Sequence, residues 1–205
     1  SWTRMYSEGY NKYYSWAVNT LDVVKPELMA LCFPLFVQCY IALVKKEASE
    51  EARAFWDAWH EAHMNLYGRE LRALSMLTSK DQLTDGSNFL QSNQFVLQSQ
   101  RNKFKVKVSN FSFGMLTTFL AQNDLLLIAA IINDRVQFHR VEEIQDTGSI
   151  EPELLGYAAP RAGVGANYVG GGAYGLTQLM LGVPGKGKPR GGGKSGGGMP
   201  DYRNN

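Results

Sequence analysis

The sequence contains few of the residues that build metal centres, disulfide frameworks and nucleophilic active sites. Only two cysteines and three histidines occur among its 205 residues. Cys32 and Cys39 lie seven positions apart in one apolar run, and on a helix that spacing separates them by roughly 10 Å, too far for a disulfide. Neither has polar neighbours that would activate a thiolate. We therefore expect two reduced core thiols, typical of an intracellular protein, and no cysteine nucleophile.

Glycine is scarce in the first part of the chain and abundant afterwards. Four glycines precede position 148 and the other 17 follow from there. From Pro160 onward the chain has six cations and one anion, so this part carries +5 while residues 1–159 carry −3. Glycine-rich sequence buries too little apolar surface to offset the entropy of ordering. We therefore predict a helical assembly domain at residues 1–145 and a flexible, basic, glycine-rich linker or tail at residues 146–205.

Charge is missing from the most apolar part of the chain. Residues 28–44 form a run of 17 residues without a charged side chain, between Glu27 and Lys45. A membrane span needs about 20 such residues and is not usually followed by charged amphipathic helices, and the opening segment has no secretory signal pattern. We predict a buried central helix, with a membrane span as the alternative. Pro34 should kink this helix or divide it into two.

Apolar residues recur at helical spacing over most of the predicted domain. The predicted helices are residues 2–23, 28–44, 49–77 and 88–100, a helix capped by Ser109, and a last helix from Leu125 to about Phe138. Gly68 weakens the third of these and predicts a bend there. Ser79 has capping-box spacing for a short helix that follows it.

One segment has the periodicity of a strand. Residues 103–108 alternate strictly between lysine and an apolar residue. A lone strand is not stable without a partner, and no second convincing strand is found, so we expect an extended connector that packs Phe104, Val106 and Val108 inward. The predicted fold class is all-α, a compact domain of about six to nine helices followed by a disordered glycine-rich tail.

Two patterns suggest site chemistry. Asp57, His60 and His63 follow one another at intervals of three, roughly along one ridge of a helix. Such an array could hold a metal, but it lacks the zinc-protease pattern and a second cluster of ligands, so we favour histidines packed beside tryptophans. Residues 193–195, GKS, end like a phosphate-binding loop, but position 188 is lysine where that motif needs glycine. We expect no catalytic residue, no metal and no cofactor.

Three stretches carry a resemblance to a known family. The first is KPEL at residues 25–28 followed by FPLFV at residues 33–37. The second is ARAF at residues 52–55, with later leucines at helical spacing. The third is RNKF at residues 101–104 with IIN at residues 131–133. In this order, over about residues 10–138, they resemble the N-terminal conserved domain of subunit 5 of the general transcription factor TFIID, a WD40-bearing factor that some organisms share with SAGA.

The resemblance implies a nuclear, non-catalytic scaffold in a transcription complex. In the family this domain is a compact helical unit that helps to assemble histone-fold subunits, chiefly the pair of subunits 6 and 9. The WD40 region of the same protein is a further expected partner, and a homodimer is left open. The chain shows neither WD40 repeats nor the family's LisH-like hairpin, which a fragment of the longer protein would explain, and the glycine-rich part resembles the start of the family's linker.

Two candidate partner-binding surfaces follow from residue type. Aromatic side chains dominate the energetics of interfaces. The first surface is a set of four aromatic residues on the predicted N-terminal helix, which we expect to be exposed: Trp2, Tyr6, Tyr10 and Tyr14. The second is a basic stripe of four residues: Arg101, Lys103, Lys105 and Lys107.

Nucleic-acid binding through the basic stripe and the cationic tail is the alternative function. The sequence pI of about 8.5 belongs to the tail and does not indicate a basic folded surface. A solvated face of an extended segment is the commoner cause of such a stripe. We therefore expect no direct contact with DNA.

Overall fold

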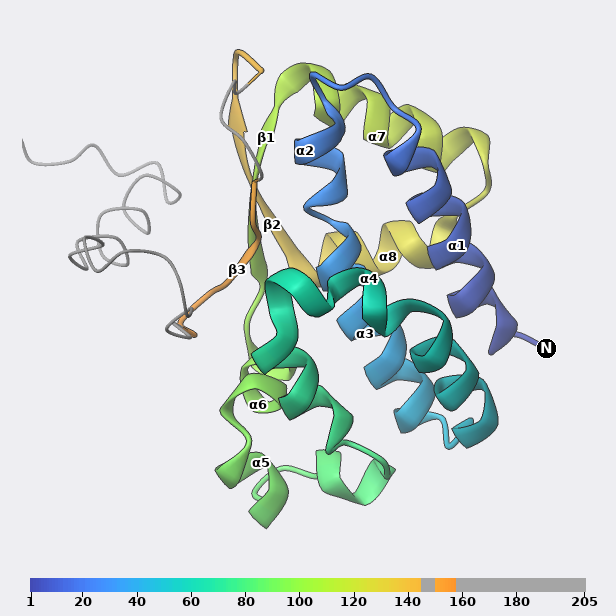
Figure 1. Ribbon diagram of the computed structural model, residues 1–205, viewed down its shortest axis with the longest axis vertical. Helices are drawn as coiled ribbons and strands as arrows, with labels where there is room; N and C mark the ends of the chain where they lie inside the picture. Colours follow the sequence, from blue (N-terminus) through green and yellow to red (C-terminus); the bar gives the residue numbers. More distant parts are fainter. Residues whose placement is uncertain (145–149, 158–205) are drawn as a thin grey trace, which may run out of the picture. The chain divides into compact units, whose positions relative to one another are not determined.

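The computed structural model describes residues 1–144 and 150–157, and the structural statements below concern these residues. They form helices with a small sheet along one side of them (Figure 1). In chain order the elements are α1 (Arg4–Val18), α2 (Lys25–Met29), α3 (Cys32–Lys45), α4 (Ser49–Ser75), a 3-10 turn η1 (Lys80–Leu83), α5 (Asn88–Ser92), α6 (Gln94–Arg101), β1 (Phe104–Ser109), α7 (Asn110–Gln122), α8 (Leu126–Arg135), β2 (Val136–Val141) and β3 (Glu153–Leu154). The predicted all-α class is confirmed in that the described domain is mostly helical, and the small sheet is an addition to it.

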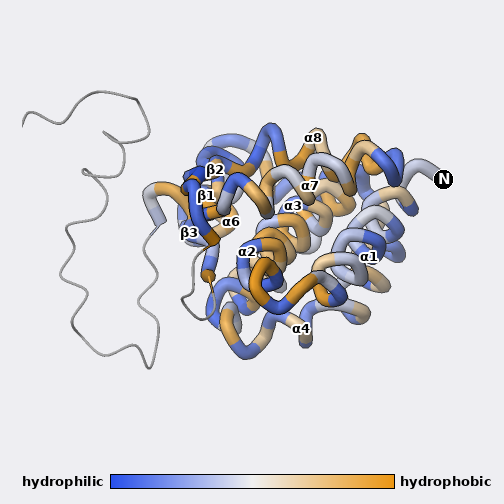
Figure 2. The backbone as a smooth tube through the Cα atoms, turned by 90° about the horizontal axis from the view of Figure 1, so that it is seen from above, coloured by the Kyte–Doolittle hydropathy of each residue, from blue (hydrophilic) through white to orange (hydrophobic). Residues whose placement is uncertain are grey.

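The apolar run without charge forms the centre of the domain. It divides into α2 and α3 at Ala30 and Leu31, because Pro34 has no N–H to donate to the carbonyl four residues earlier. Residues Lys25–Lys45 are long and apolar enough to cross a membrane, but 89% of their most apolar window is buried inside the domain. Figure 2 shows α3 as an apolar tube lying among the other helices. The prediction of a buried central helix, divided near Pro34, is confirmed.

The long helix α4 packs along α3 and bends in its second half. Tyr67 leaves the helical region at φ −126° and ψ 30°, directly before Gly68, so the bend predicted there is confirmed. Phe33 of α3 stacks on the Tyr67 ring at 3.8 Å between centroids. The bend therefore places an aromatic side chain against the start of α3.

The three strands correct the sequence prediction for residues 103–108. β1 pairs in parallel with β2, with Phe104 opposite Val136, and antiparallel with β3, with Phe104 opposite Leu154. The expectation that this segment has no partner strand is wrong, as is the continuation of the last helix to Phe138, because α8 ends at Arg135. Phe104, Val106 and Val108 do face the core, as predicted.

Residues 150–157 lie within the range that composition assigns to the tail. Leu154 is buried, and the N–H of Leu155 donates to the carbonyl of Lys103 at 2.9 Å. The ring of Tyr157 meets that of Phe95 edge-on at 5.6 Å. Residues 145–149 and 158–205 lie outside the described residues, so the flexible tail and its boundary near residue 145 stay predictions.

A buried carboxylate connects α2 to the start of α7. Glu27 is fully buried, and its Oε2 accepts hydrogen bonds from the N–H and the hydroxyl of Ser109 at 2.9 and 2.7 Å. The Ser109 hydroxyl oxygen in turn accepts the N–H of Ser112 at 3.1 Å, which confirms the predicted helix cap. The carboxylate therefore lies at the positive N-terminal end of α7, where the helix dipole favours an anion.

Replacing Gly9 by alanine should destabilise the domain, although alanine is the better helix former. Gly9 lies where α1 crosses α8, and a Cβ there would come within 2.9 Å of Cγ1 of Ile128. Overpacking of this kind costs about 1–3 kcal/mol, and only about 1 kcal/mol returns through helix propensity. Urea unfolding should therefore show a lower free energy of unfolding. Gly114→Ala is the control, because a Cβ at Gly114 meets nothing within 4 Å, and an equal loss there would contradict the argument.

Candidate interaction surface

The four aromatic residues predicted to be exposed lie in two different environments. Trp2 is 52% exposed, and the Nζ of Lys46 lies 3.8 Å from the centre of its ring. Tyr14 is half-buried beside Trp59, with 4.9 Å between ring centroids. These two remain candidate contact residues.

Tyr6 and Tyr10 are buried, so the prediction that their rings are exposed is wrong. Both side chains lie on the side of α1 that packs into the core. Tyr10 is completely buried and contacts the rings of Phe36, Phe55 and Trp59 edge-on. These two side chains therefore belong to the core.

The histidine array does not converge on one point. His63 is buried, and its Nε2 lies 2.6 Å from the hydroxyl of Tyr10. His60 places Nδ1 2.8 Å from the carbonyl of Trp56, and Asp57 lies 4.0 Å from Arg53. In the part of the chain that the structure describes, no three possible ligands gather in a metal-binding group. The array therefore contributes one residue to the core and two to the helix surface.

Burial also determines the protonation of the ionisable core residues. Desolvation lowers the pKa of His63 to about 4 and raises that of the Tyr10 hydroxyl, so both side chains are neutral near pH 7. Burial likewise raises the pKa of the thiols of Cys32 and Cys39, and both are free. The prediction that both thiols lie in the core is confirmed. Such thiols are poor nucleophiles, because the reactive form is the thiolate.

Of the four residues of the basic stripe, Lys105 and Lys107 lie on the face of β1 that is turned away from the helices. Lys103 lies directly before the strand, and Arg101 is the exposed last residue of α6. Lys103 and Lys107 are exposed and Lys105 is half-buried, while the residues between them face the core. Glu153 of β3 stands directly opposite Lys105 in the sheet. The Nζ of Lys103 donates to the carbonyl of Asn133 at 3.4 Å. The stripe is therefore a real surface feature with an acidic residue beside its middle.

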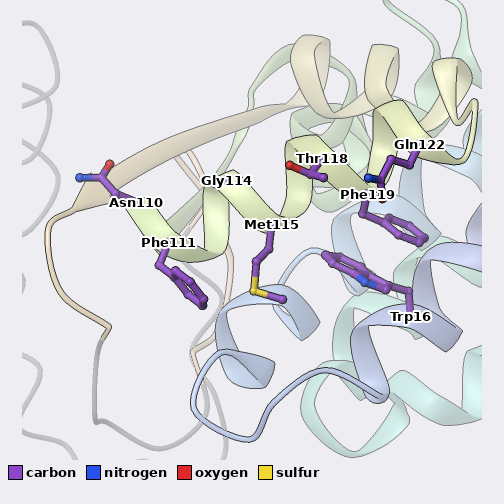
Figure 3. A pocket seen from close by; sticks show the side chains of 8 residues that line it. All are labelled: Trp16, Asn110, Phe111, Gly114, Met115, Thr118, Phe119 and Gln122. Carbon is purple, nitrogen blue, oxygen red and sulfur yellow. The ribbon is translucent and has the colours of Figure 1, made fainter.

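A hollow that sequence reasoning missed lies along α7. The α7 hollow has a volume of about 570 Å³. Its lining residues are Trp16, Asn110, Phe111, Gly114, Met115, Thr118, Phe119 and Gln122. Figure 3 shows seven of them along one side of α7, with Trp16 approaching from α1. The Trp16 and Phe119 rings stack at 4.1 Å with 5° between their planes, and Phe111 is 54% exposed. None of the lining residues carries a charge.

The sequence indicates this hollow only through an absence of charged residues. Residues 110–122 contain no charged side chain, although several of them are exposed, whereas an exposed helix face normally carries charges. Helical periodicity identifies the core side of α7 through Leu116 and Leu120, both buried. It does not identify the aromatic partner, because Trp16 comes from a helix about a hundred residues earlier in the chain.

Comparison with known proteins gives one consistent result. The family model described as "WD40 associated region in TFIID subunit, NTD2 domain" matches residues 2–136. TFIID subunit 5 of Arabidopsis thaliana is 32% identical over 133 residues, which are 65% of this chain and 19% of that protein. The Schizosaccharomyces pombe protein named "SAGA complex/transcription factor TFIID complex subunit Taf5" is 24% identical over 139 residues, 66% of this chain and 20% of that protein.

A solved structure has the same fold. The TAF5 N-terminal domain of Encephalitozoon cuniculi superposes with a TM-score of 0.59 at 21% sequence identity, covering 66% of this chain and 98% of that chain. The chain spans about a fifth of the length of the curated relatives it matches. The family match extends from the N-terminus to the first residue of β2, so it covers α1 to α8 and β1.

Proposed function

Because this chain belongs to the family of the NTD2 domain of TFIID subunit 5, we propose that it is a non-catalytic scaffold domain that binds histone-fold subunits. The pair of subunits 6 and 9 is the proposed partner. The WD40 region of the same protein is a second proposed partner, since the family description associates the two regions. The observation that carries the proposal is the family match over residues 2–136, which coincides with the helical domain.

The use of the ionisable core residues supports a scaffold rather than an enzyme. Glu27 binds the backbone and hydroxyl of Ser109, and His63 is paired with Tyr10. Both interactions join elements distant in sequence and hold the helices together. The described surface also includes the uncharged α7 hollow, and depletion of charge is typical of the centre of a protein interface.

The proposed place of action is the nucleus. One relative is named as a subunit of TFIID and another as a subunit of both SAGA and TFIID, and both complexes act in transcription. Membership in the family therefore supports a role in the nuclear transcription machinery, and we propose assembly of TFIID or SAGA as the process served.

The test is size-exclusion chromatography with light scattering on the full chain, with and without a co-expressed TFIID histone-fold pair of subunits 6 and 9. We expect co-elution at the mass of one chain with one pair. The chain measured alone gives its own oligomeric state, so a dimer would appear there. Separate elution of chain and pair would overturn the proposed binding role of this domain.

A competing proposal, nucleic-acid binding, has a matched test. Lys105 and Lys107 lie on one face of β1, and Lys103 directly precedes the strand. Contacts to the DNA backbone make affinity fall steeply with salt. We expect the triple alanine variant and a chain ended after Tyr157 to bind a random DNA duplex as weakly as the full chain does in fluorescence anisotropy at about 150 mM salt. A salt-sensitive affinity that both changes abolish would favour the competing function.

A further inference from the structure

Gly114 has no explanation within the described domain. It lies in the middle of α7, where glycine is the least favourable residue other than proline. Its φ is not in the left-handed region, and a Cβ there would meet nothing within 4 Å. Neither backbone conformation nor packing within the domain requires glycine at this position. A glycine has no side chain, so at the floor of a hollow it allows another backbone to approach closely.

The surroundings of Gly114 are matched to an apolar partner. Phe111 and Met115 lie on the same side of α7, and the stacked pair of Trp16 and Phe119 closes the other end of the hollow (Figure 3). Burying a charged side chain against such a lining would leave the charge without a partner. An occupant that fits this lining is therefore uncharged and mainly apolar on the side that faces it.

Charges at the two ends of α7 give the occupant a direction. At the N-terminal end the guanidinium of Arg140 lies 4.4 Å from the centre of the Phe113 ring, and its Nε donates to Oδ1 of Asn110 at 2.9 Å. At the C-terminal end stands the exposed Asp124. The dipole of α7 adds partial positive charge at the first end and partial negative charge at the second. A helix that runs antiparallel to α7 presents the opposite charge at both ends.

We propose that the α7 hollow is the docking site for an amphipathic helix of a partner subunit, which runs antiparallel to α7 and approaches its backbone most closely at Gly114. The inference rests on the proposed scaffold function and identifies the surface through which the domain binds its partner. The partner's helix places an uncharged apolar face in the hollow, and its C-terminal end lies beside Arg140. The basic stripe and Trp2 are not part of this contact.

Two substitutions test the hollow without damaging the fold. Phe111→Asp places a carboxylate in the first turn of α7, where the helix dipole favours an anion. The fold should tolerate this change, because the Phe111 side chain is largely exposed. Gly114→Ala adds a methyl group to the floor and should raise the midpoint of thermal unfolding. Leu126→Asp is the control, since Leu126 is 76% exposed, begins α8 and does not line the hollow.

The measurement is the Kd of each full-length variant for the purified histone-fold pair of subunits 6 and 9, with circular dichroism to verify folding. We expect a loss of about tenfold or more for Phe111→Asp, a smaller loss for Gly114→Ala despite its higher stability, and no change for Leu126→Asp. Wild-type binding that all three variants retain would overturn the hollow and leave the scaffold function standing. If the wild-type chain does not bind the pair, the docking site and the scaffold function are both overturned. If light scattering shows that the wild-type chain is a dimer and that Phe111→Asp is a monomer, the hollow binds a second copy of this chain instead.

Discussion

Replacing Glu27 by alanine is expected to lower the free energy of unfolding by about 3–5 kcal/mol. The carboxylate is completely buried and accepts two hydrogen bonds from Ser109. Its removal leaves the N–H and hydroxyl of Ser109 without this acceptor and creates a cavity between α2 and the start of α7. Urea unfolding followed by tryptophan fluorescence would measure the loss.

Two further variants separate the hydrogen bonds from the charge. Glu27→Gln keeps the shape and one acceptor oxygen, so we expect a smaller loss, of about 1–3 kcal/mol. If the alanine variant does not fold at all, the glutamine variant supplies the measurement. Glu8→Ala is the control, since Glu8 is an exposed carboxylate on α1, and its effect should stay within about 0.5 kcal/mol. A Glu27→Ala loss as small as that of Glu8→Ala would contradict the proposed role of the carboxylate.

Acidification should weaken the domain through His63. Burial lowers its pKa from 6.5 to about 4. At a pH between these two values, His63 is protonated in the unfolded chain and neutral in the folded chain. The stabilisation is complete above pH 6.5 and is lost as the pH falls from 6.5 towards 4. A pKa shift of this size corresponds to a loss of about 3 kcal/mol in the free energy of unfolding. Urea unfolding at intervals between pH 7 and pH 4 should show this decline.

The control for this prediction is a comparison of slopes, because carboxylates also titrate in acid. His63→Gln should be less stable at pH 7, since the contact with Tyr10 changes, but its stability should fall less steeply between pH 6.5 and pH 4. Equal slopes in the wild-type chain and in His63→Gln would remove His63 from the explanation.

Local signals in the sequence predicted much of the helical structure. Pro34 divides the apolar run, Gly68 follows the bend in α4, and Ser109 caps α7, because each depends on residues within one or two turns. The sheet was missed for the opposite reason. β2 follows α8 without a break, and the parallel partner that makes it a strand lies about thirty residues earlier in the chain.

The candidate surface was harder to predict than the fold. Trp2, Tyr6, Tyr10 and Tyr14 are all aromatic and follow one another at four-residue spacing, and only the packing of α1 against its neighbours decides which rings are buried. The α7 hollow requires two helices to meet, and Trp16 reaches Phe119 across about a hundred residues of sequence. Residue type therefore suggested contact surfaces, while exposure depended on long-range packing.

The short strand β3 bears on how the domain should be produced in isolation. A fragment ended at residue 145 would keep α1 to α8 but would lose Leu154 and the backbone pairing of β1 at Phe104 and Lys105. The uncovered flank of β1 would then offer free N–H and C=O groups beside an apolar side chain, a template on which strands of other molecules can assemble. Extending the fragment to Tyr157 would keep that flank covered and the preparation free of aggregates.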